Sequence, residues 1–218
     1  MSIERAMVLA AGRGERMRPL TDQVPKPLLS VRGKPLIVYH LEKLQRLGVK
    51  QVVINLAWLG EQVRAALGDG ARWGLQILYS DEGQQALETG GGILQALPLL
   101  GPQPFLVLNA DVFTEFDFSA LQLAPEALAQ LVLVANPMHH PRGDFALING
   151  RVQEQGGARW TYSGIGLYRP ELFAGCSPGK FPLLPLLRRA IAGGRLYGQV
   201  FDGVWNDVGS VERLAALQ

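Results

Sequence analysis

Short apolar runs alternate along this chain with segments in which apolar residues recur every three or four positions. Runs of this kind are typical of strands that are buried on both faces of a sheet. They predict strands at 6–9, 52–54, 75–79, 105–108 and 131–134. The spacing leaves room for a helix or a turn between each strand and the next.

The segment from Pro35 to Leu47 shows the helical spacing most clearly, with Ile37, Leu41 and Leu44 on one face. Proline is suited to a first helical turn, and glycine after the last turn is typical of a helix end. The pattern therefore predicts a helix that stops at Gly48. Further helices are predicted at 60–67, 93–97, 183–192 and 211–217.

Strand and helix patterns that alternate in this way predict an α/β fold with right-handed crossovers. We expect a Rossmann-like, mostly parallel mixed sheet flanked by helices. Between 142 and 168 the pattern changes to shorter strands, and Asn149-Gly150 is a strong hairpin signal. In such sheets ligands bind beyond the carboxyl ends of the strands.

Composition narrows the class of protein. A chain of 218 residues with 48% hydrophobic residues can bury one well-developed core. A net charge of +2 does not favour nucleic-acid binding, and the single cysteine, Cys176, cannot form an internal disulfide. No apolar run reaches the ~18 residues of a membrane helix, and no signal peptide is expected. We expect a cytoplasmic monomer or small homo-oligomer that binds neither nucleic acid nor membrane.

Candidate chemistry is concentrated in the connection after the first predicted strand, at 9–27. Gly12 and Gly14 allow the backbone to approach an anion, and four cations (Arg13, Arg16, Arg18 and Lys26) accompany them. The run from Gly12 lacks the Gly-Lys-Ser/Thr ending of a Walker loop. The position three after Gly14 is Met17, where a dinucleotide fingerprint needs glycine.

The ordered motifs of this region resemble the signature of the sugar-1-phosphate nucleotidylyltransferases. The chain has Gly-Arg-Gly-Glu-Arg at 12–16, Pro-Leu-Thr at 19–21, Pro-Lys-Pro at 25–27 and Lys-Pro at 34–35. The resemblance extends over essentially the whole chain. It implies a GT-A-like nucleotidyltransferase fold with a small β-rich sugar-binding lobe.

The resemblance also implies one domain with three parts and no C-terminal β-helix domain. We expect a nucleotide-binding half at about 1–136, a sugar-binding lobe at about 137–204, and a metal-binding strand end with a closing helix at 205–218.

The implied reaction is attack of a sugar 1-phosphate on a nucleoside triphosphate, with release of pyrophosphate. Within the family the resemblance favours UTP and N-acetylmuramate 1-phosphate, in cell-wall recycling. Mannose 1-phosphate with GTP, or another pair of the family, is an alternative. A catalytically inactive nucleotide-sugar sensor or regulatory subunit is an alternative of another class.

Asp111 and Asp207 are the implied metal ligands. Asp111 ends an apolar strand, and Asp207 matches the family's late Trp-x-Asp-x-Gly element. Two carboxylates with phosphate oxygens and waters suit Mg²⁺. Arg16 and Lys26 are expected to face the phosphates, so that Arg16, Lys26 and Asp111 form the catalytic set.

The remaining site residues are assigned by their motifs. The segment Leu-Glu-Thr-Gly-Gly-Gly at 87–92 resembles the family's second nucleotide loop, in which Thr89 is expected to cap the following helix, while Glu82 and Gln84 are near enough to read the base. The predicted nucleotide-binding residues are Leu9, Ala10, Ala11, Gly12, Arg13, Gly14, Lys26, Glu88, Thr89 and Gly90. The predicted sugar-binding residues are Asn55, Asn109, Arg142, Asp144, Ser163 and Gly164, with Thr161 beside them.

One departure from the family concerns the sugar phosphate. Many relatives hold it with a lysine of the sugar lobe, but this chain has no lysine between Lys50 and Lys180. Arg142 is the candidate replacement, and a lactyl carboxylate would need a cation such as Arg142 or Arg159. The adjacent His139 and His140 are interpreted as surface residues, because they lack partners at zinc-ligand spacing.

Overall fold

The computed structural model describes residues 3–218 of the chain. Apolar runs form the central strands, and polar turns separate them. The strands are β1 (Arg5–Leu9), β2 (Ser30–Val31), β3 (Lys34–Pro35), β4 (Gln51–Leu56), β5 (Gln76–Asp81), β6 (Phe105–Asn109), β7 (Val112–Thr114), β8 (Ala129–Val134), β9 (Phe145–Ile148), β10 (Arg151–Gln153), β11 (Arg159–Tyr168), β12 (Leu196–Phe201) and β13 (Trp205–Asp207).

The helices follow the predicted amphipathic segments closely. Gly48 ends the second helix with a positive φ of 89°, as predicted from its position. The α-helices are α1 (Leu20–Gln23), α2 (Leu36–Leu47), α3 (Gly60–Leu67), α4 (Glu88–Leu100), α5 (Leu184–Ala192) and α6 (Val211–Ala215). Within residues 3–218, none of these helices combines the length and the apolarity that a membrane crossing requires.

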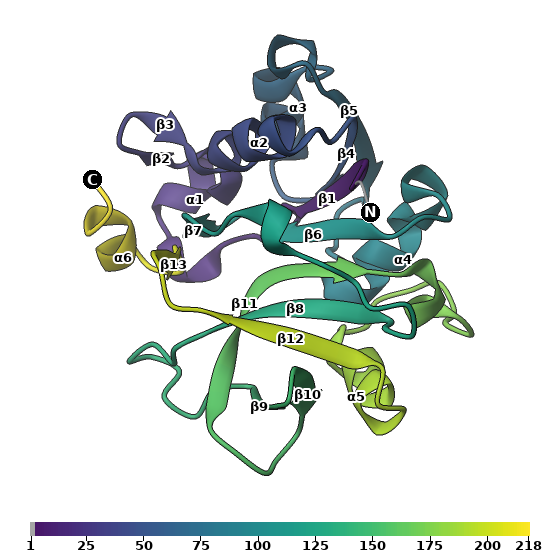
Figure 1. Cartoon of the computed structure of the whole chain (residues 1–218). Helices are drawn as coiled ribbons and strands as arrows, with labels where there is room; N and C mark the ends of the chain where they lie inside the picture. Colours follow the sequence, from purple (N-terminus) through teal and green to yellow (C-terminus); the bar gives the residue numbers. More distant parts are fainter. Residues whose placement is uncertain (1–2) are drawn as a thin grey trace.

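One nine-stranded sheet carries the fold, in the order β5-β4-β1-β6-β11-β8-β12-β10-β9 (Figure 1). The strands β5, β4, β1 and β6 are mutually parallel. β11 lies between β6 and β8 and is antiparallel to both, whereas β12 is parallel to β8. The sheet is therefore mixed, and the predicted α/β fold with flanking helices is confirmed.

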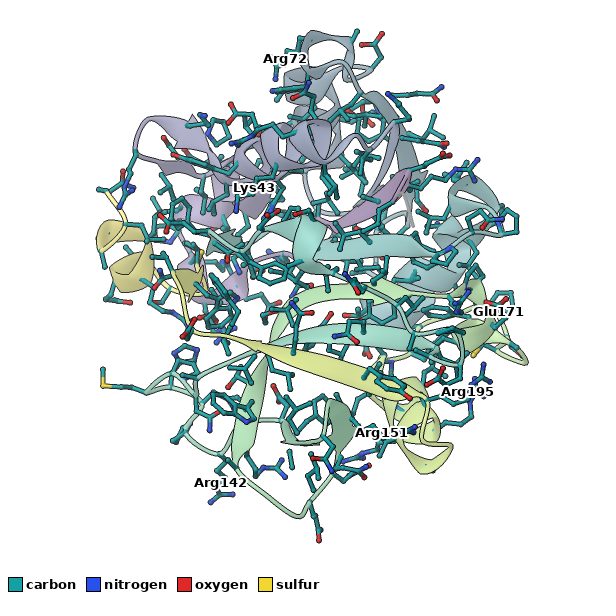
Figure 2. The ribbon with its side chains drawn as sticks, in the orientation of Figure 1. Lys43, Arg72, Arg142, Arg151, Glu171 and Arg195 are labelled. Atoms are coloured by element: carbon teal, nitrogen blue, oxygen red, sulfur yellow. The ribbon has the colours of Figure 1, made fainter. Side chains whose placement is uncertain are left out.

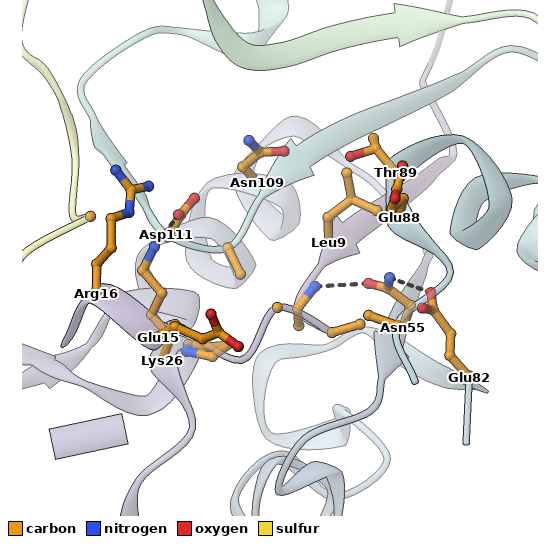
Figure 3. Close-up of a pocket in the computed structure, with 18 residues that line it drawn as sticks. Leu9, Glu15, Arg16, Lys26, Asn55, Glu82, Glu88, Thr89, Asn109 and Asp111 are labelled. Carbon is orange, nitrogen blue, oxygen red and sulfur yellow. Dashed lines mark hydrogen bonds and ion pairs between the residues drawn. The ribbon is translucent and has the colours of Figure 1, made fainter. Parts of the chain in front are cut away.

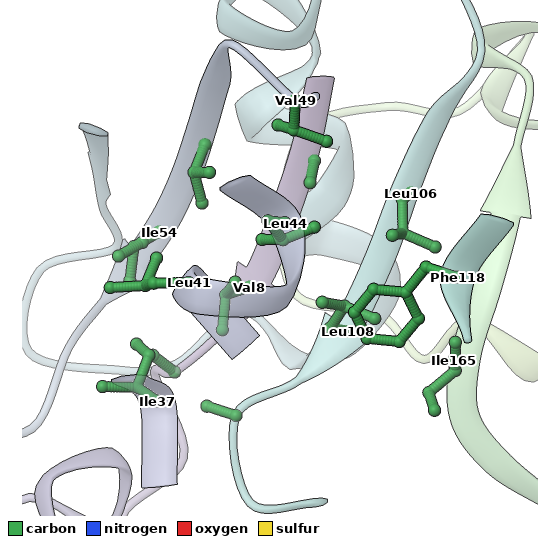
Figure 4. Close-up of a cluster of buried hydrophobic side chains, with 14 of the residues drawn as sticks. Val8, Ile37, Leu41, Leu44, Val49, Ile54, Leu106, Leu108, Phe118 and Ile165 are labelled. Atoms are coloured by element: carbon green, nitrogen blue, oxygen red, sulfur yellow. The ribbon is translucent and has the colours of Figure 1, made fainter. Parts of the chain in front are cut away.

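Both faces of the parallel strands are covered, which explains their continuous apolar runs. Along β1, Val8 faces the layer that contains α2, and Met7 faces the layer that contains α4. Ile37, Leu41 and Leu44 of α2 pack on the first face (Figure 4). Each side chain taken from water in these layers stabilises the fold by roughly 1.5–3 kcal/mol.

A second, two-stranded sheet joins distant parts of the chain. β13 pairs antiparallel with β7, and Asp207 lies opposite Val112 in the register. Val208 N donates to the Asp111 carbonyl at 2.8 Å, which extends the pairing by one residue. The two predicted metal ligands thus lie on neighbouring strands, although 96 positions (207 − 111) separate them along the chain.

Of two local predictions, the structure confirms one and contradicts the other. The hairpin at Asn149-Gly150 is confirmed: it joins β9 to β10, and both residues have positive φ. The predicted capping role of Thr89 is wrong, because α4 begins at Glu88 and Thr89 is already its second residue. The glycines at 90–92 are helical, and a Cβ on Gly91 would collide with the Gly179 carbonyl oxygen. These glycines therefore admit a neighbouring chain segment rather than ending a loop.

Candidate functional site

The signature loop leaves β1 and turns sharply at Gly14. Gly14 has a φ of +69°, and a Cβ there would lie 2.9 Å from the Thr21 methyl group. A larger residue is therefore disfavoured both by the backbone conformation and by this close contact. The Thr21 hydroxyl donates to the Gly14 carbonyl at 2.9 Å, and Ala10 N donates to Asn55 Oδ1 at 2.8 Å. The loop is thus fastened at both ends, whereas the Cα of Gly12 faces open space.

This loop forms one wall of a cleft of about 410 Å³ at the carboxyl ends of β1, β4 and β6. Arg16, Lys26 and Asp111 gather at one end of it, and Glu82 and Thr89 lie at the other (Figure 3). One end of the cleft therefore holds two cations beside the carboxylates of Glu15 and Asp111, and the start of α4 bounds the other end. Its lining residues are Leu9, Ala10, Ala11, Gly12, Gly14, Glu15, Arg16, Lys26, Pro27, Asn55, Glu82, Ala86, Glu88, Thr89, Asn109, Ala110, Asp111 and Gly209.

Each carboxylate predicted to bind metal is paired with a cation. Lys26 Nζ forms an ion pair with Asp111 Oδ2, and the lysine side chain is only 12% exposed. Asp207 accepts from Arg213 Nη1 at 2.7 and 2.8 Å, and His139 Nε2 lies 3.3 Å from its Oδ1. Asp207 itself does not line the cleft, but it stands two residues before Gly209, which does.

Asn55 and Glu82 link two walls of the cleft. Asn55 is buried, and its Nδ2 donates to Glu82 Oε1 at 2.6 Å. Glu82 Oε2 in turn accepts from Leu87 N at 2.6 Å, just before α4. The predicted sugar ligand Asn55 thus has both amide atoms engaged, one with Ala10 and one with Glu82. Its position ties the signature loop to the second nucleotide loop.

Several residues assigned to the sugar make their contacts within the lobe itself. Asp144 accepts from Tyr162 N at 2.8 Å and contacts His140 Nε2 at 2.9 Å. Ser163 is 1% exposed and donates to the Val132 carbonyl at 2.7 Å. None of these side chains lines the cleft in the part of the chain that the structure describes.

Gly164 and Arg142 are placed differently from one another. Gly164 lies against the side chain of Asn109, where a Cβ would approach Asn109 Nδ2 to 2.5 Å. Its backbone therefore supports a residue of the cleft. Arg142 is exposed at the outer end of the lobe, at the opposite end of the molecule from Arg72 (Figure 2). The structure does not bring Arg142 to the cleft.

A family model described as "Nucleotidyl transferase" matches residues 5–154, more than half of the chain. A Neisseria meningitidis protein named N-acetylmuramate alpha-1-phosphate uridylyltransferase is 54% identical over 98% of this chain and 96% of its own length.

The chain belongs to the nucleotidyl transferase family.

Two further comparisons agree with this family assignment. A Caulobacter vibrioides protein of the same name as the Neisseria protein is 39% identical, covering 97% of this chain and 94% of its own length. A crystal structure of a Bacillus anthracis protein in complex with sucrose superposes with a TM-score of 0.84, covering 98% of this chain and 93% of the other. At 20% identity this last likeness shows the fold alone.

In this nucleotidyl transferase, two of the predicted nucleotide-binding residues, Arg13 and Gly90, do not line the cleft. The Arg13 guanidinium stacks 4.4 Å from the Trp58 ring centroid, an arrangement that holds the side chain against the protein. Gly90 packs under Phe181, where a Cβ would approach the ring to 2.5 Å. Neither residue is among those that line the cleft.

Some residues of the transferase site were not predicted from the sequence. Glu15, Pro27, Ala86 and Ala110 line the cleft simply because they neighbour predicted residues. Arg213 was not predicted at all, since only the return of α6 toward β13 brings it to Asp207. His139 and His140 were interpreted as surface residues, and their side chains are 41% and 40% exposed, although each also contacts an aspartate. Within residues 3–218 no group of three or more His, Cys, Asp or Glu is arranged to hold a metal.

The helix α2 carries a buried histidine. His40 of α2 is 1% exposed. Burial, reinforced by the nearby charge of Lys43, lowers the pKa of His40 from 6.5 to about 4. The ring is therefore neutral at physiological pH, and the transferase has an acid-sensitive group in its core beneath Asn109 and Asp111.

Proposed function

We propose that this nucleotidyl transferase joins UTP to N-acetyl-α-muramate 1-phosphate, giving UDP-N-acetylmuramate and pyrophosphate. The observation that carries the proposal is the full-length likeness, at 54% and 39% identity, to two proteins named for this activity. The cleft supports it, because Arg16, Lys26 and the fastened glycine loop suit a triphosphate. We place this step in the recycling of peptidoglycan and in the cytoplasm.

In the proposed reaction a non-bridging oxygen of the sugar phosphate forms a bond to the α-phosphorus of UTP. The bond from that phosphorus to the α,β-bridging oxygen breaks, and its electron pair leaves with pyrophosphate. The nucleophile is already an anion, so no strong base is needed. Positioning and cationic stabilisation must then supply most of the rate enhancement.

Arg16 and Lys26 supply that stabilisation in the proposal. Both line the end of the cleft where Asp111 lies, and Lys26 is held in place by its ion pair with Asp111. A cation whose position is fixed before the reaction loses little energy to reorganisation when charge develops on the leaving group. The backbone of Leu9–Gly12 and the first turn of α4 form the walls that hold the nucleoside.

A divalent ion completes the proposed site, and the residues present fit it. Asp207 lies in β13 opposite Val112 of β7, and Asp111 directly precedes Val112, so we propose that the two carboxylates bind one ion. With phosphate oxygens and water as further ligands, this donor set suits Mg²⁺. When bound, Mg²⁺ would neutralise charge on the two reacting phosphates.

The proposed division of the chain has three parts. Residues 1–136 bind the nucleotide, 137–204 cover the sugar, and 205–218 return the second carboxylate and the closing helix to the site. The proposed partners are the two small substrates alone, with a monomer or small homo-oligomer as the working unit.

Pyrophosphate release tests the proposal. The purified enzyme is given UTP, GTP or dTTP with N-acetylmuramate, mannose or glucose 1-phosphate. We expect the highest kcat/KM for UTP with N-acetylmuramate 1-phosphate. Preference for GTP with mannose 1-phosphate would contradict the substrates and leave the reaction type standing. Absence of release with every pair would favour a regulatory protein.

A further inference from the structure

The cations that line the cleft come from one side of it. Arg16 and Lys26 both belong to the signature loop and its continuation, and in the described part of the chain no lysine or arginine beyond residue 111 is a lining residue. The second substrate of the proposed reaction brings its own phosphate to the α-phosphorus. That phosphate is a second anion, and it needs a counter-charge of its own.

Arg213 stands at the rim of the cleft, beside Gly209. Its Nη2 lies so close to Gly209 that any side chain at Gly209 would collide with it. Gly209 lines the cleft, and the Arg213 side chain is 25% exposed. The guanidinium is therefore held at the rim between β13 and α6, which lie beside β7 (Figure 1).

The contacts of Arg213 hold it in place and leave donors free for a ligand. Nη1 donates to both oxygens of Asp207 and contacts His139 Nε2 at 2.6 Å. A guanidinium has five N–H donors, and the hydrogen bonds found for this side chain all use Nη1. His139 belongs to the loop between β8 and β9, so the lobe meets the closing helix at this point.

Other cations of the second half have different partners. Arg159 donates to the backbone carbonyls of Arg142 and Glu154, among others, and thus fastens the hairpin loop. Arg188 pairs with Glu154 at 3.0 Å, away from the cleft. Lys180 Nζ lies 3.9 Å from Glu88, which places it at the α4 end of the cleft.

We propose that Arg213, supported by His139, binds the phosphate of the sugar 1-phosphate and takes the role expected of a lysine in the sugar lobe. The inference rests on the proposed function. An arginine already fixed by a carboxylate presents its remaining N–H groups in the fork that matches a phosphate. The predicted candidate, Arg142, is then not required for this contact.

Steady-state kinetics of Arg213→Gln at saturating Mg²⁺ test the assignment. We expect the KM for the sugar 1-phosphate to rise about 10- to 100-fold, the scale of one lost charge-assisted contact, while the KM for UTP changes by less than about twofold. Isothermal titration should show the same selective loss for UDP-N-acetylmuramate, with UTP binding retained. Arg188→Gln is the matched control, since it removes a paired arginine outside the site.

The variant Arg213→Lys and thermal unfolding distinguish a lost phosphate contact from a folding defect. Lysine keeps the charge but not the fork, so we expect a smaller rise in the same KM with an unchanged melting temperature. If kcat alone falls and both KM values stay at the wild-type level, Arg213 serves only to orient Asp207 and the proposal is overturned. A titration of Mn²⁺ binding by electron paramagnetic resonance then reports that orientation directly.

A comparison of two sugar phosphates distinguishes binding of the phosphate from binding of the lactyl carboxylate. N-acetylglucosamine 1-phosphate lacks the lactyl group, and its inhibition constant should rise in Arg213→Gln by the same factor as the KM for N-acetylmuramate 1-phosphate. A loss confined to the N-acetylmuramate compound would overturn the phosphate assignment in favour of the carboxylate. If the enzyme instead uses another sugar phosphate, the proposed function fails, and the effect of Arg213→Gln on that substrate still decides the inference.

Discussion

The nucleotide half and the lobe use their polar side chains in opposite ways. In the described chain every residue that lines the cleft, other than Gly209, lies between residues 9 and 111. Polar residues of the lobe, such as Asp144 and Ser163, bind neighbouring backbone groups instead. The half with parallel strands places its polar side chains at the strand ends, where they line the cleft. The polar side chains of the lobe instead stabilise the structure of the lobe itself.

This difference has a physical cause. Parallel strands whose ends meet at one sheet edge gather loops and side chains there without further support. β11 is antiparallel to both of its neighbours, and its register shifts between Tyr162 and Gly166. An interrupted ladder leaves backbone groups that side chains such as Ser163 must satisfy.

The largest expected effect concerns the strand-end half. Asp111→Asn removes the charge that fixes Lys26 and one proposed metal ligand. We expect pyrophosphate release to fall by about 1,000-fold, the scale of losing a preorganised electrostatic contact. The melting temperature should stay near that of the wild type, because the substitution keeps the shape. Retention of most activity would show that the strand ends do not carry the chemistry.

Substitutions at two glycines distinguish a role in binding from a role in packing. The Cα of Gly12 faces open space, so Gly12→Ala should leave stability unchanged and lower kcat/KM for UTP by about 100-fold, because the methyl group would meet the triphosphate. Gly91→Ala would place its methyl group against the Gly179 carbonyl, and we expect a loss of about 3 kcal/mol in unfolding free energy. Urea denaturation and pyrophosphate release measure the two effects. A destabilised Gly12→Ala protein would refute the comparison of the two sites.

Acid should weaken the nucleotide half through His40. The folded protein holds the His40 pKa at about 4, whereas the unfolded chain has its ordinary value of 6.5. Between these values the unfolded state binds more protons, so stability falls as the pH is lowered through this window, by roughly 3 kcal/mol in all. His40→Leu should flatten this part of the stability profile, as measured by urea unfolding from pH 7 to pH 4. An unchanged slope would mean that other groups cause the acid sensitivity.

The smallest effect is expected in the lobe. Arg142 is exposed and lies outside the cleft, so Arg142→Gln should change every kinetic constant by less than about twofold and stability by less than about 0.5 kcal/mol. Substrate titrations with both substrates check this result. A large rise in the KM for the sugar phosphate would restore Arg142 as its ligand and weaken the contrast between the halves.

Sequence reasoning was most successful where contacts are local. The helix over Leu36–Leu47 and the loop after β1 follow from spacing and from glycine chemistry, which neighbouring residues determine. The start of α4 was misplaced, because the glycines that suggested a loop are required by Gly179 and Phe181, which lie about 90 positions farther along the chain.

The same limit applies to the candidate site. Lys26 and Asp111 were predicted from their motifs, and the structure brings them into contact. The insertion of β11 between β6 and β8 could not be predicted from the pattern of the strand itself. The contact of Arg213 with His139 joins residues 74 positions apart, and nothing local in the sequence marks it.

The strands β7 and β13 pair in the folded protein but are synthesised at well-separated times. β1, β4, β5 and β6 all lie within the first 109 residues, so they leave the ribosome before Asp207 has been synthesised. At that stage the chain holds Lys26 and Asp111 but not Gly209, which also lines the cleft. In the proposed function, a chain that stopped before residue 207 lacks one of the two proposed metal ligands.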